Sequence, residues 1–134
     1  DFIVHVHTNS DGRIMRGTGA HSATAAGAKL AMKIAPLSRA RRPIITDRVN
    51  GITTPRRTID MLVTQKGVAV NPKNMELHDR LREAGIKLVD INELKALAER
   101  TSGVPKKPAL GDRIVANVIY RDGTVIDTIK QVAD

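Results

Sequence analysis

A stretch of small residues, 17–28, is the part of the sequence best suited to binding an anionic group. Its glycines would let backbone N–H groups approach a ligand closely. A helix starting behind them would add unpaired donors and a positive dipole, and hydroxyl and imidazole side chains would add further donors. We therefore predict that a ligand is bound by Gly17, Gly19, Ala20, His21, Ser22 and Thr24. The alternative is a tight strand-to-helix turn whose alanines serve close packing.

Basic residues are concentrated in the segment that follows. Residues 29–57 carry eight basic groups and one acid, a net charge of +7, in a chain whose formal net charge is +8. Such an excess attracts anions, and guanidinium groups suit carboxylates and phosphates. Arg42 and Arg48, which flank an expected strand at 43–46, are the preferred candidates for binding an anionic substrate. A solvated surface is the competing interpretation for each of them and for the other candidates, Arg39, Arg41, Arg56 and Arg57.

Length and composition indicate one folded unit. The 134 residues suit a single domain, 1–134, with one modest core. No apolar run reaches the roughly 20 residues needed to cross a bilayer. The chain begins at Asp1 instead of methionine, so we expect a fragment of a longer protein. It contains no cysteine, which excludes disulfides and a cysteine nucleophile and fits a reducing cytoplasm.

The elements that must position these residues alternate between strands and helices. Mostly continuous apolar, β-rich runs are typical of strands buried on both faces, as in a parallel sheet. These runs span 2–8, 30–37, 43–46, 60–64 and 67–70.

Helices and a hairpin complete the expected fold. One helix should run from Asn71 to about Ala84, and a second should follow Asp90, which is a good N-cap residue. Two β-branched arms, 113–120 and 124–132, flank an Asp-Gly turn and predict a hairpin. The fold class is therefore α/β, with an open, mainly parallel sheet flanked by helices and a C-terminal antiparallel hairpin.

Three blocks of sequence resemble the C-terminal part of the citrate lyase alpha subunit, a member of the CoA-transferase superfamily. The first is the small-residue run Ala20-His21-Ser22-Ala23-Thr24-Ala25-Ala26-Gly27-Ala28. The second extends from Ile45-Thr46-Asp47-Arg48-Val49 through Ile52-Thr53-Thr54-Pro55 to Gly67-Val68-Ala69-Val70-Asn71-Pro72. The third is Tyr120-Arg121-Asp122-Gly123-Thr124-Val125-Ile126-Asp127. They occur in the family's order over nearly the whole chain.

The resemblance implies a CoA-transferase-like fold and an acyl exchange. In that family, citrate replaces acetyl on an acyl-carrier protein, giving the citryl carrier and acetate. The carrier thiol belongs to a phosphoribosyl-dephospho-CoA prosthetic group. The implied partners are the carrier (gamma) subunit and the citryl lyase (beta) subunit, and no metal is required by the alpha subunit. A carboxylate acceptor is already ionised at neutral pH and needs no general base. We name no catalytic residue, because the resemblance implies a reaction without a covalent enzyme intermediate, and the sequence lacks the glutamate-bearing glycine-rich loop of CoA transferases that form one.

Two departures from the family pattern leave the acid substrate open. Ala20 stands where the family has glycine, and Ala23 stands where it has aspartate. The missing carboxylate keeps a non-catalytic scaffold subunit as an alternative. A basic nucleic-acid-binding module is the other alternative, which the near absence of aromatic residues disfavours. His5 and His7 share one face of the first expected strand, but no third metal ligand is placed near them.

Overall fold

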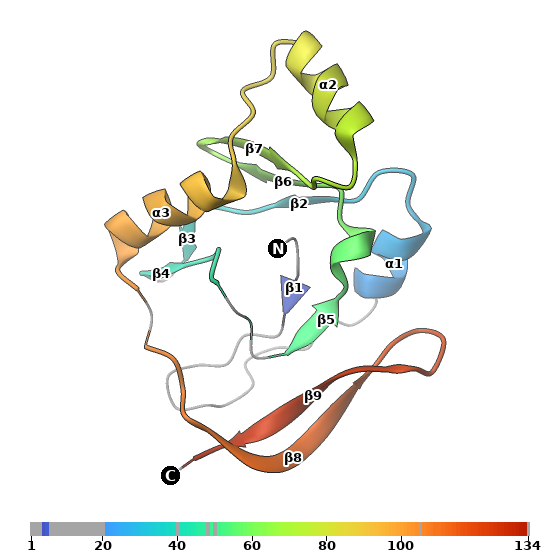
Figure 1. Cartoon of the computed structure of the whole chain (residues 1–134), viewed down its shortest axis with the longest axis vertical. Helices are drawn as coiled ribbons and strands as arrows, with labels where there is room; N and C mark the ends of the chain where they lie inside the picture. Colours follow the sequence, from blue (N-terminus) through green and yellow to red (C-terminus); the bar gives the residue numbers. More distant parts are fainter. Residues whose placement is uncertain are drawn as a thin grey trace.

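The computed structural model describes residues 4–5, 21–39, 41–47, 49, 51–104 and 106–133 (Figure 1). Its elements, in chain order, are β1 (Val4–His5), α1 (His21–Gly27), β2 (Met32–Ile34), β3 (Ser38–Arg39), β4 (Arg42–Pro43), β5 (Ile52–Thr54), the 3₁₀ turn η1 (Arg56–Thr58), β6 (Met61–Thr64), β7 (Gly67–Val70), α2 (Met75–Glu83), α3 (Ile91–Ser102), β8 (Leu110–Ile119) and β9 (Val125–Val132). The α/β class is confirmed. None of the helices in these ranges is both long enough and apolar enough to cross a membrane.

The central sheet has three strands in the order β2-β6-β7 and is mixed. β2 pairs with β6 in parallel, whereas β6 and β7 form an antiparallel hairpin in which Thr64 lies opposite Gly67. The expectation of a mainly parallel sheet is therefore wrong for the described strands. The reason is geometric: only Gln65 and Lys66 separate the two runs, and a parallel crossover needs a dozen or more residues.

Two small antiparallel pairs flank this sheet. β1 pairs with β5, and β3 with β4 across a tight turn in which Arg41 has a positive φ of 61°. Of the expected strand at 43–46, only Pro43 lies in a strand, as the second residue of β4. The expected strand at 30–37 is shorter in the structure, where β2 spans Met32–Ile34. Pro36 limits β2, because proline cannot donate to a ladder.

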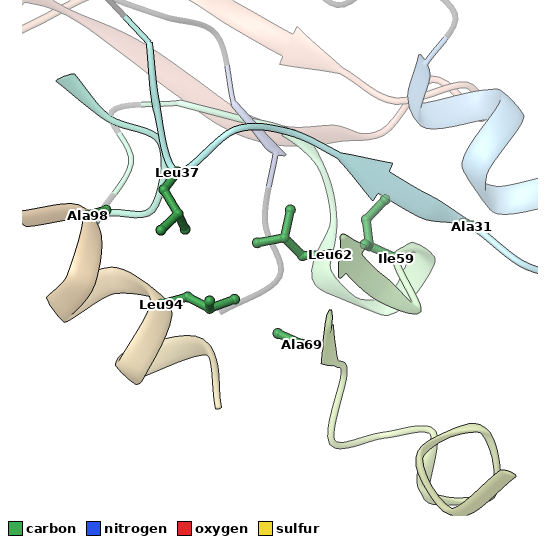
Figure 2. Close-up of a cluster of buried hydrophobic side chains, with 7 residues drawn as sticks. All are labelled: Ala31, Leu37, Ile59, Leu62, Ala69, Leu94 and Ala98. Atoms are coloured by element: carbon green, nitrogen blue, oxygen red, sulfur yellow. The ribbon is translucent and has the colours of Figure 1, made fainter. Parts of the chain in front are cut away.

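The core lies between α3 and the central sheet (Figure 2). Leu94 points from α3 toward Leu62 and Ala69 in the sheet, and Ala98 packs one turn further along the helix. Ile91 and Leu97 of α3 also pack partly buried against this cluster, so α3 presents an apolar face to the sheet. The full cluster is Ala31, Leu37, Ile59, Leu62, Ala69, Leu94 and Ala98.

Side chains cap the N-termini of α2 and α3, but α2 starts later in the chain than expected. Asp90 caps α3 by accepting a hydrogen bond from the Asn92 N–H at 2.7 Å. Asn74, not Asn71, caps α2, accepting from the Leu77 N–H at 3.2 Å. Asn71 is instead fully buried and bonded to the chain before β6, as described below.

The C-terminal hairpin β8–β9 is confirmed, and it is attached to the rest of the fold through β5. The Asp127 carboxylate accepts a hydrogen bond from the Ile52 N–H at 2.6 Å, and β9 contacts β5. The hairpin therefore runs along one side of the described fold, with its turn close to α1 (Figure 1). This attachment brings residues near 57 and near 121 together.

Candidate functional site

Of the predicted ligand-binding stretch 17–28, the structure describes residues 21–28, of which 21–27 form the helix α1. Gly17, Gly19 and Ala20 lie outside the described residues, and so do the side chains of His21 and Ser22, whose backbones form the first turn of α1. Thr24 is exposed, while Ala25 packs against the core. Since α1 contacts β5 and η1, it is a surface helix seated on the core and its outer side faces solvent.

The two preferred arginines do not gather around α1. Arg42 is exposed on β4, which packs beside α3, on the opposite side of the described fold from α1 (Figure 1). Arg48 lies outside the described residues. The basic side chains that the structure places beside α1 are different ones, and they line a cleft.

The cleft, of about 470 Å³, lies between the end of α1, the turn η1 and the tip of the C-terminal hairpin. We call it the α1–hairpin cleft. Its size is in the range of about 300–1,000 Å³ that small-molecule sites occupy. Its lining is formed by Ala25, Ala26, Ala28, Lys29, Arg57, Thr58, Asp60, Lys73, Tyr120, Arg121 and Asp122. Four cations and two carboxylates give this lining a net charge of +2.

Asp60 and Lys73 form a pair on one wall of the cleft. The Lys73 Nζ lies 3.4 Å from an Asp60 carboxylate oxygen and also donates to the Arg57 carbonyl. The other Asp60 oxygen accepts from the Ala31 N–H at 2.8 Å. The Asp60 side chain is only 14% exposed, so its charge is engaged by partners in the protein and Lys73 is largely neutralised.

Arg57, unlike Lys73, lies over an aromatic ring. Its guanidinium carbon is 5.3 Å from the centroid of the Tyr120 ring, a cation–π contact. Tyr120 is buried, with 8% of its surface exposed, and it begins the hairpin turn. The contact therefore links η1 to the hairpin and orients a guanidinium group at the cleft.

Asp122 is held within the hairpin turn by a neighbour. Its carboxylate accepts from both the hydroxyl and the N–H of Thr124, at 2.6 and 3.0 Å. These hydrogen bonds, with a smaller contribution from the charge of Arg57, hold the pKa of Asp122 below its ordinary value. Asp122 is therefore ionised at neutral pH and would oppose an anion in the cleft.

Asn71 positions the turn that carries Arg57. Its side-chain amide donates to the carbonyls of Arg56 and Ile59, at 3.0 and 2.7 Å, and its amide oxygen accepts from the Lys73 N–H at 3.2 Å. Asn71 has no exposed surface. One buried side chain thus fixes both η1 and the segment that leads to Lys73.

Sequence reasoning included Arg57 among its candidates but ranked it below Arg42 and Arg48, and it did not select Lys29, Lys73, Tyr120 or Arg121. The Pro55 break before Arg57 and the Asp-Gly turn after Arg121 were visible signals that both lie at exposed turns. Nothing in the spacing indicates that the two turns meet. Their approach depends on the contact between β5 and β9.

Fold and cleft together define an α/β unit with a cationic, ligand-sized cleft. The family model "Citrate lyase, alpha subunit (CitF)" matches residues 1–132, and the chain belongs to the citrate lyase alpha subunit family. The resemblance seen in the sequence is thereby confirmed.

Curated relatives and a solved structure agree with this assignment. The citrate lyase alpha chain of Klebsiella pneumoniae is 48% identical over 132 residues, 98% of this chain and 26% of that protein. The Escherichia coli (strain K12) alpha chain is 45% identical over 133 residues, 99% of this chain and 26% of that one.

A crystal structure described as the alpha subunit of citrate lyase from Streptococcus mutans, in complex with citrate, superposes with a TM-score of 0.91. It is 39% identical to this chain and is matched over 99% of this chain and 26% of its own length. The chain thus spans about a quarter of the length of these relatives.

Proposed function

We propose that this chain is part of a citrate:acyl-carrier-protein transferase, the alpha subunit of a citrate lyase. The observation that carries the proposal is the 44–48% identity to citrate lyase alpha chains over 98–99% of the chain. The reaction exchanges one thioester for another: citrate becomes bonded to the carrier thiol, and acetate leaves. The proposed partners are the beta and gamma subunits, and the gamma subunit carries the phosphoribosyl-dephospho-CoA group.

The chemistry needs an oriented carboxylate and donors for a developing oxyanion. We assign these tasks to the stretch that leads into α1, with Gly17, Gly19 and Ala20 supplying backbone donors and His21, Ser22 and Thr24 supplying side-chain donors. Beside α1, the structure offers Arg57 and Arg121 as cations. Arg42, on β4 and away from α1, and Arg48, which lies outside the described residues, keep their role as predicted anion-binding residues.

The test is an exchange assay with the full alpha subunit. Acetylated carrier protein is mixed with citrate, citramalate or related acids, and the mass of the carrier is followed. We expect the carrier to gain the mass of the citryl group in place of acetyl. A subunit that assembles with beta and gamma yet exchanges no acid would instead establish the scaffold alternative.

Ala23→Asp should raise the rate of citrate exchange several-fold. The change restores the carboxylate of the family pattern at a half-buried position near the start of α1, whose first turn contains no acid. A negative charge there also complements the helix dipole, by about 0.3–1 kcal/mol. The measurements are the exchange rate and the urea midpoint. Ala23→Asn, equal in size and uncharged, is the control, and an equal response to both substitutions would contradict a role for the carboxylate.

A further inference from the structure

We propose that the α1–hairpin cleft is a phosphate-ester site, in which Lys29, Arg57 and Arg121 hold the phosphate group. This inference stands on the geometry of the cleft and goes beyond the acyl exchange proposed above. The phosphate could belong to a free phosphorylated metabolite or to a phosphorylated group carried by a partner protein. Both sources share the chemistry that the cleft would recognise.

The first argument is the balance of charge in the lining. Lys73 is engaged by Asp60 at 3.4 Å. Lys29, Arg57 and Arg121, by contrast, form no ion pair with any acid in the part of the chain that the structure describes. The net charge of the lining is +2, and a phosphate monoester carries a charge of about −1.5 to −2 at neutral pH. The cleft therefore complements a phosphate in charge.

The second argument is the direction from which the cations come. Lys29 follows α1, Arg57 belongs to η1 and Arg121 lies in the hairpin turn, so each cation comes from a different wall. A tetrahedral phosphate presents three terminal oxygens in different directions, whereas a carboxylate presents two oxygens in one plane. Three separate cationic walls thus favour a phosphate over a single carboxylate.

The third argument is that two of the three walls are fixed in advance. Asn71 holds the backbone of η1 through two hydrogen bonds, and Tyr120 packs against the Arg57 guanidinium. The hairpin is tied to β5 by the hydrogen bond between Asp127 and the Ile52 N–H. Walls that are already ordered lose little entropy when a ligand binds, which favours affinity.

The sequence supplies its own probe for this site. The 134-residue chain contains one tyrosine and no tryptophan, so its intrinsic fluorescence arises from Tyr120, in the lining of the cleft. We expect inorganic pyrophosphate to change this fluorescence in a saturable way, with an affinity that falls as salt rises. Calorimetry should give the same dissociation constant.

Variants locate the binding site. The double variant Arg57→Gln/Arg121→Gln should bind pyrophosphate at least about tenfold more weakly, because two charge-assisted hydrogen bonds are lost. Asp122→Asn should bind it about two- to fivefold more tightly, because a like charge is removed while the acceptor for Thr124 is kept. Arg113→Gln, on the exposed start of β8 in the same hairpin, is the matched control and should leave affinity unchanged.

The probes and the assays separate the possible outcomes. ADP and phosphopantetheine, compared by calorimetry, distinguish a free nucleotide from a carrier-borne arm. Citrate that binds more tightly than pyrophosphate, no saturable binding of pyrophosphate, or unchanged affinity in the double variant would each overturn the inference. A full alpha subunit that exchanges acids but binds no pyrophosphate would refute this site alone. Pyrophosphate binding without exchange would refute only the proposed function.

Discussion

Replacing Gly67 by alanine should destabilise the protein by about 2–5 kcal/mol, through backbone strain and overpacking together. Gly67 begins β7 with a φ of +145°, a conformation that residues with a side chain rarely adopt. An added Cβ would lie 2.5 Å from Cγ2 of Val89 and 3.1 Å from the Lys87 carbonyl oxygen. Urea unfolding followed by far-ultraviolet circular dichroism would measure the loss, and a fully unfolded variant would meet the expectation.

Gly85→Ala is the matched control, since it shares the positive φ without the contact. Gly85 has a φ of +74°, and a Cβ added there meets nothing within 4 Å. Its substitution should therefore cost only the backbone term, about 1–2 kcal/mol. Equal losses at both glycines would show that the segment 87–89 does not pack on the start of β7.

The contact at Gly67 explains how the sheet is extended beyond its three named strands. Val68 donates to the Lys87 carbonyl at 3.0 Å, and Val89 donates to the Val68 carbonyl at 2.9 Å, so that Val68 and Leu88 form a parallel bridge. The chain between α2 and α3 thus lies along the edge of β7. A side chain at 67 would push this segment away from the sheet.

Elements with strong local signals could be predicted from the sequence. Helix α3 begins after Asp90 and ends before Gly103, which has a φ of +76°, as cap chemistry requires. The C-terminal hairpin turns at Asp122-Gly123, with Gly123 at a φ of +86°. In both cases, a few neighbouring residues determine the conformation, so that no distant contact is needed.

The direction in which the strands pair could not be predicted from their composition, because it depends on the length of the connections between them. The runs at 60–64 and 67–70 were correctly predicted as strands, but their continuous apolar character was interpreted as a sign of parallel pairing. The short Gln65-Lys66 connection forces a hairpin between these two runs. Parallel pairing occurs instead with segments distant in sequence, between β6 and β2 and at the bridge between Val68 and Leu88. Burial on both faces therefore described the environment of these strands and not their direction.

At the candidate site, too, features formed by neighbouring residues could be predicted, whereas features formed by residues far apart in the sequence could not. A glycine-rich stretch followed by a helix is a local pattern, and α1 (His21–Gly27) confirms the predicted helix. The cleft beside this helix joins residues separated by more than 60 positions, such as Arg57 and Tyr120. Arg42 was preferred because it flanks a strand, yet the tight turn at Arg41 directs that strand toward β3 and α3.

Asn71→Ala should destabilise the protein by about 2–4 kcal/mol, because it removes a buried amide that donates to two backbone carbonyls and accepts from the Lys73 N–H. The carbonyls of Arg56 and Ile59 would lose the amide that binds both of them, at 3.0 and 2.7 Å. Asn71 itself has no exposed surface, so water does not replace it without rearrangement. Chemical denaturation of the variant, compared with the parent chain, would measure the effect.

The same substitution tests whether stability and ligand binding are linked through η1. Without Asn71, the turn that carries Arg57 loses its fixed position, so the variant that still folds at low temperature should bind pyrophosphate several-fold more weakly. Asn92→Ala is the control: Asn92 is exposed in the first turn of α3, and its loss should change stability by less than about 0.5 kcal/mol. A folded Asn71→Ala protein with normal stability and normal pyrophosphate affinity would show that η1 is held by its own backbone, and that the Asn71 amide does not position Arg57.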